Sequence, residues 1–571
     1  MLGAAVAASL SVSSAWAQPP APAISITLKP VAADGEVRTI EVRETLTGYA
    51  GQAGRVLLEV PARITLTPGQ AYAETDIAAE DDAGPLKLTM AVEPAPPGFP
   101  LELRTFTPTR DTKGPIRLRY SATIAGAMTP RKPGPSYDLR GTGGGFGGAP
   151  WTFVLLPRGA AAPADLTFAW DFAGLPAQAR AVSVRGEGDL RWRGPPGSLY
   201  TMFFLAGRVD GYAPPGSRFH AYWIGRPPFD AQAAAQWSAR SFTALQGFFR
   251  DRDARPYTLL MRPYARPRDG GAATQGGFIL EYGVGEMSDD ARRIMFTHEM
   301  VHHFVGGLDG NSSATAWFGE GLAEFYKIRL PLRAGLIGLD AAAEQIAVMT
   351  DAYYGSPTVA TPYGEVARQR WAGEAAQNTP YSRGFMYFVT VDAAVRAASK
   401  GHRSLDDLVL AMLDSRRAGQ GYDERRWRAL LQAELGDTGV AAFDSMLGGR
   451  VLEPPADAFG PCFVRATASR PRPVLGFSED SILSAPHVVA DLEPGSNAEA
   501  AGLRNGDVIL RAAGAKPRIA HSASNLALQP RVDLTVQRAD QELPVSFSTE
   551  GPTVLYHRWS LVGARGASCV L

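Results

Sequence analysis

Cysteine is scarce in this sequence: Cys462 and Cys569 are the only two among 571 residues. Neither lies near the histidine-rich segment described below, so cysteine ligation of a metal there is excluded. In an oxidising compartment the two could pair as a disulfide. Two free buried thiols are the alternative, because the sequence gives no distance between them.

Neither sign of charge is in excess, with 57 basic and 57 acidic residues. The chain therefore lacks the basic footprint of a nucleic-acid-binding protein, and we expect no nucleic-acid partner. Long apolar runs are also missing beyond the first residues, because none reaches the ~18 residues that a membrane helix needs. A chain of this length has room for three or four domains.

The N-terminal segment is the one short apolar stretch. Leu2 to Ala17 are apolar or small residues that end in Ala15-Trp16-Ala17, which is typical of a secretory signal peptide over residues 1–17. An apolar anchor that is never cleaved is the alternative, although the stretch is short for a membrane span. We expect a periplasmic or secreted protein with no membrane span after the signal is removed.

His298, Glu299 and His302 follow the pattern His-Glu-x-x-His. Positions i and i+4 of a helix share a face, so the two imidazoles can bind one Zn²⁺. Glu299 lies close enough to take a proton from a water at that metal. Ser288 supplies a helix start signal and Gly306 a stop. For these five residues alone, a chance match on an amphipathic helix is the alternative.

Two glutamates follow on a second predicted helix. Glu320 stands at the distance from His302 by which that helix can return a carboxylate to the metal. Glu324 lies one helical turn further on, and we interpret it as the partner of the free ring N–H of a ligand histidine. A surface carboxylate is the alternative for Glu324. His303 points about 100° away from His302, which favours packing or a supporting role.

These residues carry a family resemblance. His-Glu-x-x-His followed by Trp317-Phe318-x-Glu320-Gly321-x-x-x-x-Tyr326 resembles the gluzincin metallopeptidases, in particular the glycyl aminopeptidase family, which is related to the membrane alanyl aminopeptidases. The gap between His302 and Glu320 is one residue shorter than is common in the alanyl group. The resemblance implies a thermolysin-like zinc peptidase with one Zn²⁺ per chain and peptide or unfolded protein substrates.

Tyr381 matches a further family position, where a tyrosine hydroxyl stabilises the oxyanion. The family reads Tyr-x-Lys-Gly there, and this chain has Arg383 in place of the lysine. A phenol donor aimed at developing negative charge can contribute about 10²–10³ in rate. A buried structural tyrosine is the alternative.

The strand before the metal helix departs from the family pattern. Relatives usually read Gly-Gly-x-Glu-His there, with the glutamate gripping the free amine of the substrate, whereas this chain reads Gly276-Gly277-Phe-Ile-Leu-Glu281. Ile279 holds the glutamate position. Strand side chains alternate, so Glu281 shares a face with Ile279 and is a candidate substitute. Aminopeptidase specificity is therefore open, although the hydrolytic chemistry is not.

The remaining chain predicts a multidomain α+β protein. Residues 24–211 alternate as strands of a β-sandwich-like N-terminal domain, with examples at 24–28, 38–42, 86–90 and 116–120. The glycine-rich segment 141–148 lacks a following Lys-Ser/Thr and predicts a mobile connection, not a phosphate loop. Residues 214–453 form the expected catalytic domain, with helices at 230–250 and 340–354, one opening at Pro380, and one capped by Ser404.

Residues 456–571 resemble a PDZ domain. Residues 494–509 resemble its most characteristic segment, and Leu475, Gly476 and Phe477 resemble the loop whose backbone N–H groups receive a peptide C-terminus. Cys462 and Cys569 lie near the two ends of this domain, where a disulfide would join its termini.

Our interpretation is a zinc peptidase in which His298, His302 and Glu320 hold the metal, Glu299 is the general base and Tyr381 stabilises the oxyanion. Aminopeptidase action is expected first, and an endopeptidase of the same chemistry is the alternative. An inactive peptidase-like scaffold that binds envelope proteins through its PDZ domain is a rival from another class. The natural substrate and the oligomeric state are not encoded in any motif.

Overall fold

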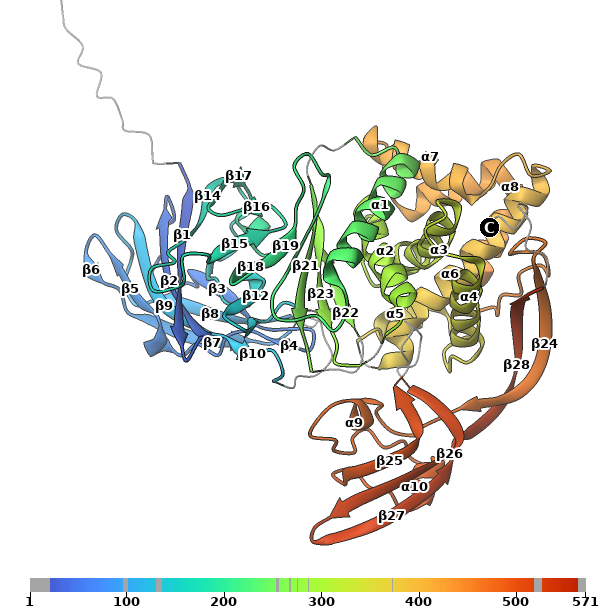
Figure 1. Cartoon of the computed structure of the whole chain (residues 1–571). Helices are drawn as coiled ribbons and strands as arrows, with labels where there is room; N and C mark the ends of the chain where they lie inside the picture. Colours follow the sequence, from blue (N-terminus) through green and yellow to red (C-terminus); the bar gives the residue numbers. More distant parts are fainter. Residues whose placement is uncertain are drawn as a thin grey trace, which may run out of the picture.

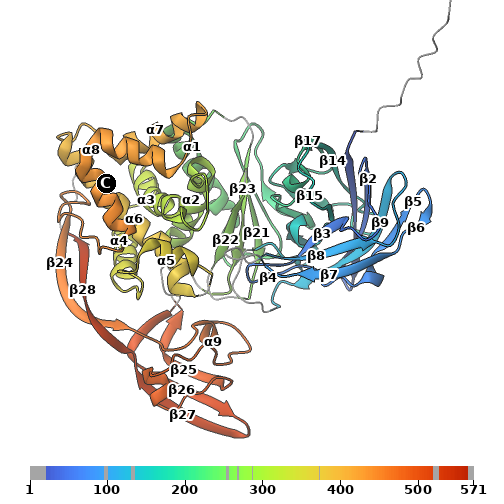
Figure 2. The same cartoon turned by 180° about the vertical axis from the view of Figure 1, so that it is seen from behind.

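The computed structural model describes residues 21–95, 101–129, 136–252, 256–265, 269–274, 276–285, 287–371, 373–517 and 526–562. The expected signal peptide at residues 1–17 lies outside them. Figures 1 and 2 show, from opposite sides, N-terminal β-sheets, a smaller sheet covered by helices, and a C-terminal unit attached to those helices. In the described part of the chain, no helix combines the length and apolar character that crossing a membrane demands.

The N-terminal region consists of three sheets, as its β-rich pattern predicts. Its strands are β1 (Ala23–Ala33), β2 (Glu36–Thr47), β3 (Leu58–Ile64), β4 (Thr67–Pro68), β5 (Ala78–Asp81), β6 (Gly84–Pro85), β7 (Leu88–Glu93), β8 (Leu101–Pro108), β9 (Ile116–Thr123), β10 (Ala125–Gly126), β11 (Arg140–Thr142), β12 (Gly145–Gly148), β13 (Leu156–Pro157), β14 (Ala164–Trp170), β15 (Arg180–Ser183), β16 (Gly186–Glu187), β17 (Leu190–Gly194) and β18 (Phe204–Gly207). The sheet orders are β17-β14-β1-β2-β9-β5-β6, β10-β11-β12-β18-β15-β16, and β13-β3-β8-β7 with β4 beside β3.

Alternation along β1 shows why these segments become strands. Ile24, Ile26 and Leu28 are fully buried, whereas the residues between them are more exposed. Successive strand side chains point to opposite faces, so this pattern places one face of the sheet in a core and the other toward solvent. Tyr120 on β9 joins the same core.

The glycine-rich segment 141–148 is ordered, which corrects the expectation of a mobile connection. Most of it belongs to β11 and β12, and every residue of β12 is buried. A Cβ atom on Gly145 would lie 2.5 Å from the Arg208 carbonyl oxygen, and one on Gly147 would lie 2.5 Å from that of Phe204. Glycine is needed here because neighbouring backbone approaches too closely for a side chain.

The central sheet separates two cores. It contains β19 (Asp210–Tyr212), β20 (Phe219–Trp223), β21 (Tyr257–Pro263), β22 (Gly270–Thr274) and β23 (Gly277–Tyr282) in the order β19-β20-β21-β23-β22. Leu260 and Ile279 pack into the N-terminal core. Leu259 and Leu280 pack into the helical core on the opposite face. Both faces are therefore apolar and covered. Figure 1 shows the sheet between the N-terminal sheets and the helices.

Eight helices follow or cover this sheet in the described residues up to 447: α1 (Ala231–Phe249), α2 (Asp289–Val305), α3 (Ala316–Arg333), α4 (Leu339–Tyr354), α5 (Tyr363–Arg368), α6 (Glu374–Ala398), α7 (Leu405–Arg417) and α8 (Glu424–Leu447). The Ser288 hydroxyl caps α2 by accepting from Ala291 N, and Ser404 forms a capping box at α7, as predicted. Pro380 does not open a helix. It lies inside α6, after the first turn of the helix has formed, and it has no backbone N–H to donate to that turn.

The C-terminal unit is joined to the helices by a long two-stranded arm. The arm pairs β24 (Phe463–Pro473) with β28 (Glu550–Leu561), and β28 packs along α4 (Figure 1). Beyond the arm, β25 (Val508–Pro517), β26 (Leu526–Arg538) and β27 (Gln541–Ser548) form a sheet with α9 (Asp480–Leu483) and α10 (Asn497–Ala500). Both helices of this unit in the described residues are only four residues long.

A buried carboxyl group in the N-terminal core gives a test of this packing. Glu44 is 1 % exposed, and its Oε2 accepts a hydrogen bond from the Tyr120 hydroxyl at 2.9 Å. Burial raises the pKa of Glu44 to about 8, against the opposing effect of that hydrogen bond. The folded protein therefore keeps this proton at pH values where the unfolded chain has lost it.

We predict that Glu44→Gln flattens the pH dependence of stability between about pH 4.5 and 8. In the parent protein the contribution of Glu44 is fully present below its unfolded pKa and is lost as pH rises through the folded one. The loss is at most about 5 kcal/mol. Urea unfolding across this range measures it, with Glu41→Gln as control, because the Glu41 side chain is 44 % exposed. Parallel profiles of Glu44→Gln and the parent protein would contradict the prediction.

Candidate metal centre

Three ligand atoms from two neighbouring helices converge on one point. The Nε2 atoms of His298 and His302 on α2 lie 3.1 Å apart. Glu320 Oε2 on α3 lies 3.5 Å from the first and 3.2 Å from the second. The three residues form a group that could hold a metal ion. The structure thus brings together the three residues predicted as ligands.

The spacing and chemistry of these donors fit zinc. Donors bound tetrahedrally at about 2.0–2.1 Å lie about 3.3–3.4 Å from one another. The three measured separations, 3.1, 3.2 and 3.5 Å, span this value. Glu320 Oε2 is also buried and accepts no hydrogen bond. A buried anionic oxygen aimed at two imidazole nitrogens is a favourable arrangement only if a cation or a proton lies between them.

Glu324 holds the first of these imidazoles in place. Its Oε1 lies 3.0 Å from His298 Nδ1, and its Oε2 lies 2.5 Å from Lys327 Nζ. Glu324 and Lys327 are both 1 % exposed. A proton on Nδ1 is directed at the carboxylate, which leaves the lone pair of Nε2 facing the centre. Glu324 therefore occupies the position predicted for it.

Charges at the centre act on each other. Burial opposes ionisation of Glu320, but the two imidazoles outweigh it and hold the pKa of this carboxyl well below its usual value. Burial lowers the pKa of His298, yet the adjacent carboxylates of Glu320 and Glu324 together raise it to about 9. The surrounding carboxylates thus favour positive charge at this point, which is the field that a bound cation requires.

Glu299 lies beside the centre on the side of strand β22. A Cβ atom on Gly271 would be 3.5 Å from Glu299 Oε1, so the carboxylate faces this strand across a space that glycine leaves open. The Tyr257 hydroxyl donates to the Glu299 carbonyl at 3.2 Å and steadies this turn of α2. Burial raises the pKa of the Glu299 side chain against the field of both histidines. A raised pKa makes a carboxylate a better proton acceptor.

Tyr381 reaches the centre from α6. Its ring is stacked on that of His298 with 5.8 Å between centroids and 16° between planes. Burial and the nearby Glu320 raise the pKa of the phenol well above its usual value. The hydroxyl therefore stays protonated and remains a hydrogen-bond donor.

Close contact between Gly321 and Gly384 lets α6 approach α3 and the candidate centre. A Cβ atom on Gly384 would lie 2.3 Å from the Trp317 carbonyl oxygen and 2.7 Å from Gly321 Cα. Gly321 follows Glu320 directly, and Gly384 lies one turn after Tyr381. The glycines of the two sequence motifs thus pack against each other, and this contact places the tyrosine beside the ligands.

Arg370 completes the centre, and it was missed in the sequence. Its Nη2 donates to Glu320 Oε1 at 3.2 Å, on the side of the carboxylate away from the histidines. The guanidinium lies over the Trp371 ring at 5.3 Å. Arg370 belongs to the segment between α5 and α6, fifty residues after Glu320, and no motif marks it. Only the tertiary fold brings it to the metal ligand.

Glu281 does not face the centre, which corrects its prediction as a substrate-binding residue. It is 4 % exposed, and its Oε1 lies 2.6 Å from Arg262 Nη2. Arg262 is fully buried and also bonds Asp138 of the N-terminal region. Glu281 shares the face of Ile279, as expected, but that face packs against the N-terminal sheets. Side chains on β23 alternate as expected, but the face that carries Ile279 and Glu281 is turned away from the centre.

Gly276 and Gly277 are likewise not at the centre. A Cβ atom on Gly277 would lie 2.2 Å from the Thr258 carbonyl oxygen of the adjacent strand. The strand that borders the centre is β22, which begins with an earlier glycine pair, Gly270-Gly271. Because β22 is the last strand of its sheet, its outer edge is not paired within the sheet. The first glycine pair was the signal that could have located this strand.

An open cleft of about 610 Å³ runs past the ligands. Ala273 and Thr274 of β22 form part of one wall. If β22 carried the family pattern after Gly270-Gly271, these two residues would stand at its glutamate and histidine positions. The remaining lining residues are Asp251, His302, His303, Phe304, Gly306, Gly307, Leu308, Ser312, Thr315, Ala316, Gly319, Glu320, Arg370, Arg416 and Arg417.

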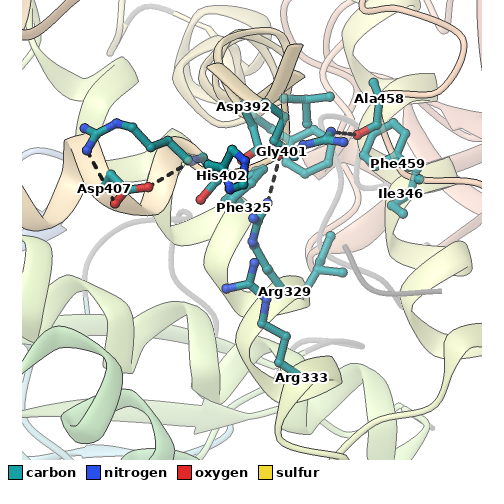
Figure 3. A pocket seen from close by; sticks show the side chains of 17 residues that line it. Phe325, Arg329, Arg333, Ile346, Asp392, Gly401, His402, Asp407, Ala458 and Phe459 are labelled. Carbon is teal, nitrogen blue, oxygen red and sulfur yellow. Dashed lines mark hydrogen bonds and ion pairs between the residues drawn. The ribbon is translucent and has the colours of Figure 1, made fainter. Parts of the chain in front are cut away.

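A second, smaller cavity of about 250 Å³ lies further along α3 and α6 (Figure 3). Figure 3 shows Arg329 directed toward Asp392, and their charged atoms are 3.0 Å apart. Asp406 pairs with Arg333 at 2.6 Å, and Arg396 pairs with Asp392 at 2.9 Å. These charges neutralise one another and tie α3, α6 and α7 together. We assign this cavity a structural role.

The remaining predicted residues lie in or near the C-terminal unit. Leu475 and Phe477 are each 6 % exposed and belong to its core, and Gly476 has a φ of +83°. Cys462 is buried and disulfide-bonded. Its predicted partner, Cys569, lies outside the described residues.

Comparisons with known proteins support the fold. No family model and no curated protein matches the sequence. The fold is similar to that of an aminopeptidase N family protein from Idiomarina loihiensis, with a TM-score of 0.63 and 14 % identity over 93 % of this chain and 97 % of that chain. An M1 zinc metallopeptidase from Deinococcus radiodurans gives a TM-score of 0.47 and 16 % identity, over 76 % and 96 % of the two chains. At such identities the likeness concerns the fold alone, and of these two structures the first has a TM-score above 0.5.

The glycine contact gives a stability prediction. Gly384→Ala forces a methyl group against backbone atoms that cannot rotate away, and should cost about 1–3 kcal/mol of unfolding free energy. Gly364→Ala in α5 is the matched control, because a Cβ atom there has no neighbour within 4 Å. Thermal denaturation of both variants measures the difference. Equal stability of the two variants would show that α6 can move away from α3 without loss.

Proposed function

We propose that this protein is a zinc-dependent peptidase. The observation that carries the proposal is the convergence of His298, His302 and Glu320 on one point, with Glu299 and Tyr381 beside it. This donor set leaves one coordination position open, as catalytic zinc sites do. The similarity in fold to an aminopeptidase N family protein agrees with it.

The chain's own residues then have distinct roles. When bound, Zn²⁺ supplies the Lewis acidity that lowers the pKa of a water and polarises the scissile carbonyl. Glu299 takes the proton of the attacking water and later passes it to the leaving amine. Tyr381 donates a hydrogen bond to the oxygen on which negative charge develops. Glu324 keeps the His298 ring in register throughout.

We further propose that peptides or unfolded proteins are the substrates and that the protein acts in the periplasm or outside the cell. The apolar N-terminal segment and the disulfide-bonded state of Cys462 support this location. The C-terminal unit resembles a PDZ domain in sequence, and we retain peptide C-termini as its proposed ligands. Aminopeptidase action is what the family resemblance implies.

Glu299→Gln should abolish most peptide hydrolysis while leaving the metal bound. We expect a loss of about 10²–10⁴ in kcat, because the amide cannot accept the proton and the three ligands are untouched. A peptide-library digest read by mass spectrometry measures activity, and elemental analysis measures zinc. Full activity in this variant would remove the proposed base. A zinc-loaded parent protein inert toward every peptide would favour the scaffold alternative.

His298→Ala should remove the metal together with the activity. Elemental analysis is expected to give about one zinc per chain in the parent protein and far less in the variant. His220→Ala is the matched control, because this histidine lies on β20, away from the centre. Equal zinc content in all three proteins would overturn the ligand assignment.

A further inference from the structure

Positive charge dominates the wall of the catalytic cleft. Arg370, Arg416 and Arg417 line it, whereas Asp251 is the one lining carboxylate in the described residues that is not a proposed metal ligand. A divalent cation at the centre would offset the negative charges of Glu320 and of Glu299 beside it. The cleft therefore offers a substrate net positive charge.

Two of these arginines donate hydrogen bonds to carbonyls at the C-termini of helices, and their positive charge is not fully offset by carboxylates. Arg416 donates to the carbonyls of Phe304 and Val305 at the C-terminus of α2, at 2.5 and 2.8 Å. Both hydrogen bonds go to carbonyls, and no carboxylate of the described residues forms an ion pair with Arg416. Arg417 donates to the Phe249 carbonyl and shares Asp414 at 2.9 Å, and it is 41 % exposed.

In the described lining of the cleft, no carboxylate stands on β22 to receive a free amino terminus. Recognition of an ammonium ion needs a carboxylate or several carbonyl acceptors at the end of the substrate path. On β22, the strand that borders the centre, the two cleft-lining side chains are those of Ala273 and Thr274. Neither carries charge. Glu281, the predicted substitute, is committed to Arg262 on the other face of the sheet.

We propose that the cleft recognises a carboxylate on the peptide substrate and does not require a free α-amino group. This inference rests on the proposed peptidase function and defines its substrate class. The substrates are acidic peptides, which are cut whether the N-terminus is free or blocked. The carboxylate can come from an Asp or Glu side chain or from the C-terminus of the peptide. Both have the planar oxygen pair that a guanidinium binds.

Matched peptides separate these sources. One set compares Glu with Gln at a position next to the cut, a second compares a free C-terminus with its amide, and a third compares a free N-terminus with its acetyl form. We expect kcat/KM to fall about three- to tenfold when the recognised carboxylate is lost. We expect no more than a twofold change on acetylation. Cut positions are read by mass spectrometry.

Charge variants in the wall then test the recognition itself. Arg416→Gln should raise KM for the acidic peptide but leave KM for its neutral counterpart unchanged, and Arg416→Lys should restore most of the difference. Arg425→Gln on α8 is the matched control, because this arginine is 89 % exposed and does not line the cleft. If Arg416→Gln fails to fold, Arg417→Gln replaces it. Zinc content confirms that each variant retains the centre.

The outcomes distinguish this inference from the proposed function. Hydrolysis that is faster for neutral peptides, or that disappears on acetylation, would overturn the inference and leave the peptidase standing. Equal KM shifts for acidic and neutral peptides in Arg416→Gln would also overturn it. If no peptide is cut by the zinc-loaded protein, the proposed function itself has failed.

Discussion

The contact between Gly321 and Gly384 is the constraint on which the candidate centre depends. It lets α3 and α6 approach until backbone nearly touches backbone, and both helices then deliver side chains to the same point. Glu320 comes from the residue before the first glycine, and Tyr381 from one turn before the second. Larger residues at the contact would separate the carboxylate from the phenol. The two motifs are thus halves of a single packing arrangement.

Local signals in the sequence were enough to locate the proposed ligands. His298 and His302 share a helical face by spacing alone, and Glu320 sits in a motif on the following helix. Arg370 and Glu281 show where such reasoning ends. Arg370 reaches the centre from the segment between α5 and α6. Glu281 follows strand alternation but faces the N-terminal core instead of the helical one. Which side of a doubly covered strand meets the substrate depends on long-range packing, which no local pattern records.

The central sheet also joins the N-terminal region to the helices that carry the candidate centre. Arg262, fully buried, bonds Glu281 on its own sheet and both the side chain and the carbonyl of Asp138 on the other side. A guanidinium removed from water needs all of these acceptors. Its position therefore fixes how the N-terminal region and the helical region meet. It also fixes the sheet that contains β22, the strand that borders the cleft. The N-terminal sheets act as a foundation for the site although they contribute no ligand to it.

The C-terminal arm has a consequence for how this chain can be divided. Strand β28 returns from the outer unit and lies along α4, where Arg470 of its partner strand pairs with Asp351 at 2.7 Å and Tyr354 stacks edge-on against His557. Excision after the two prolines at 454–455 would strip an apolar helix face of its cover. The arm is consequently part of the helical core and cannot be removed together with the outer unit. A shortened chain would have to retain both strands of the arm, with a brief turn joining them, to keep its helical half intact.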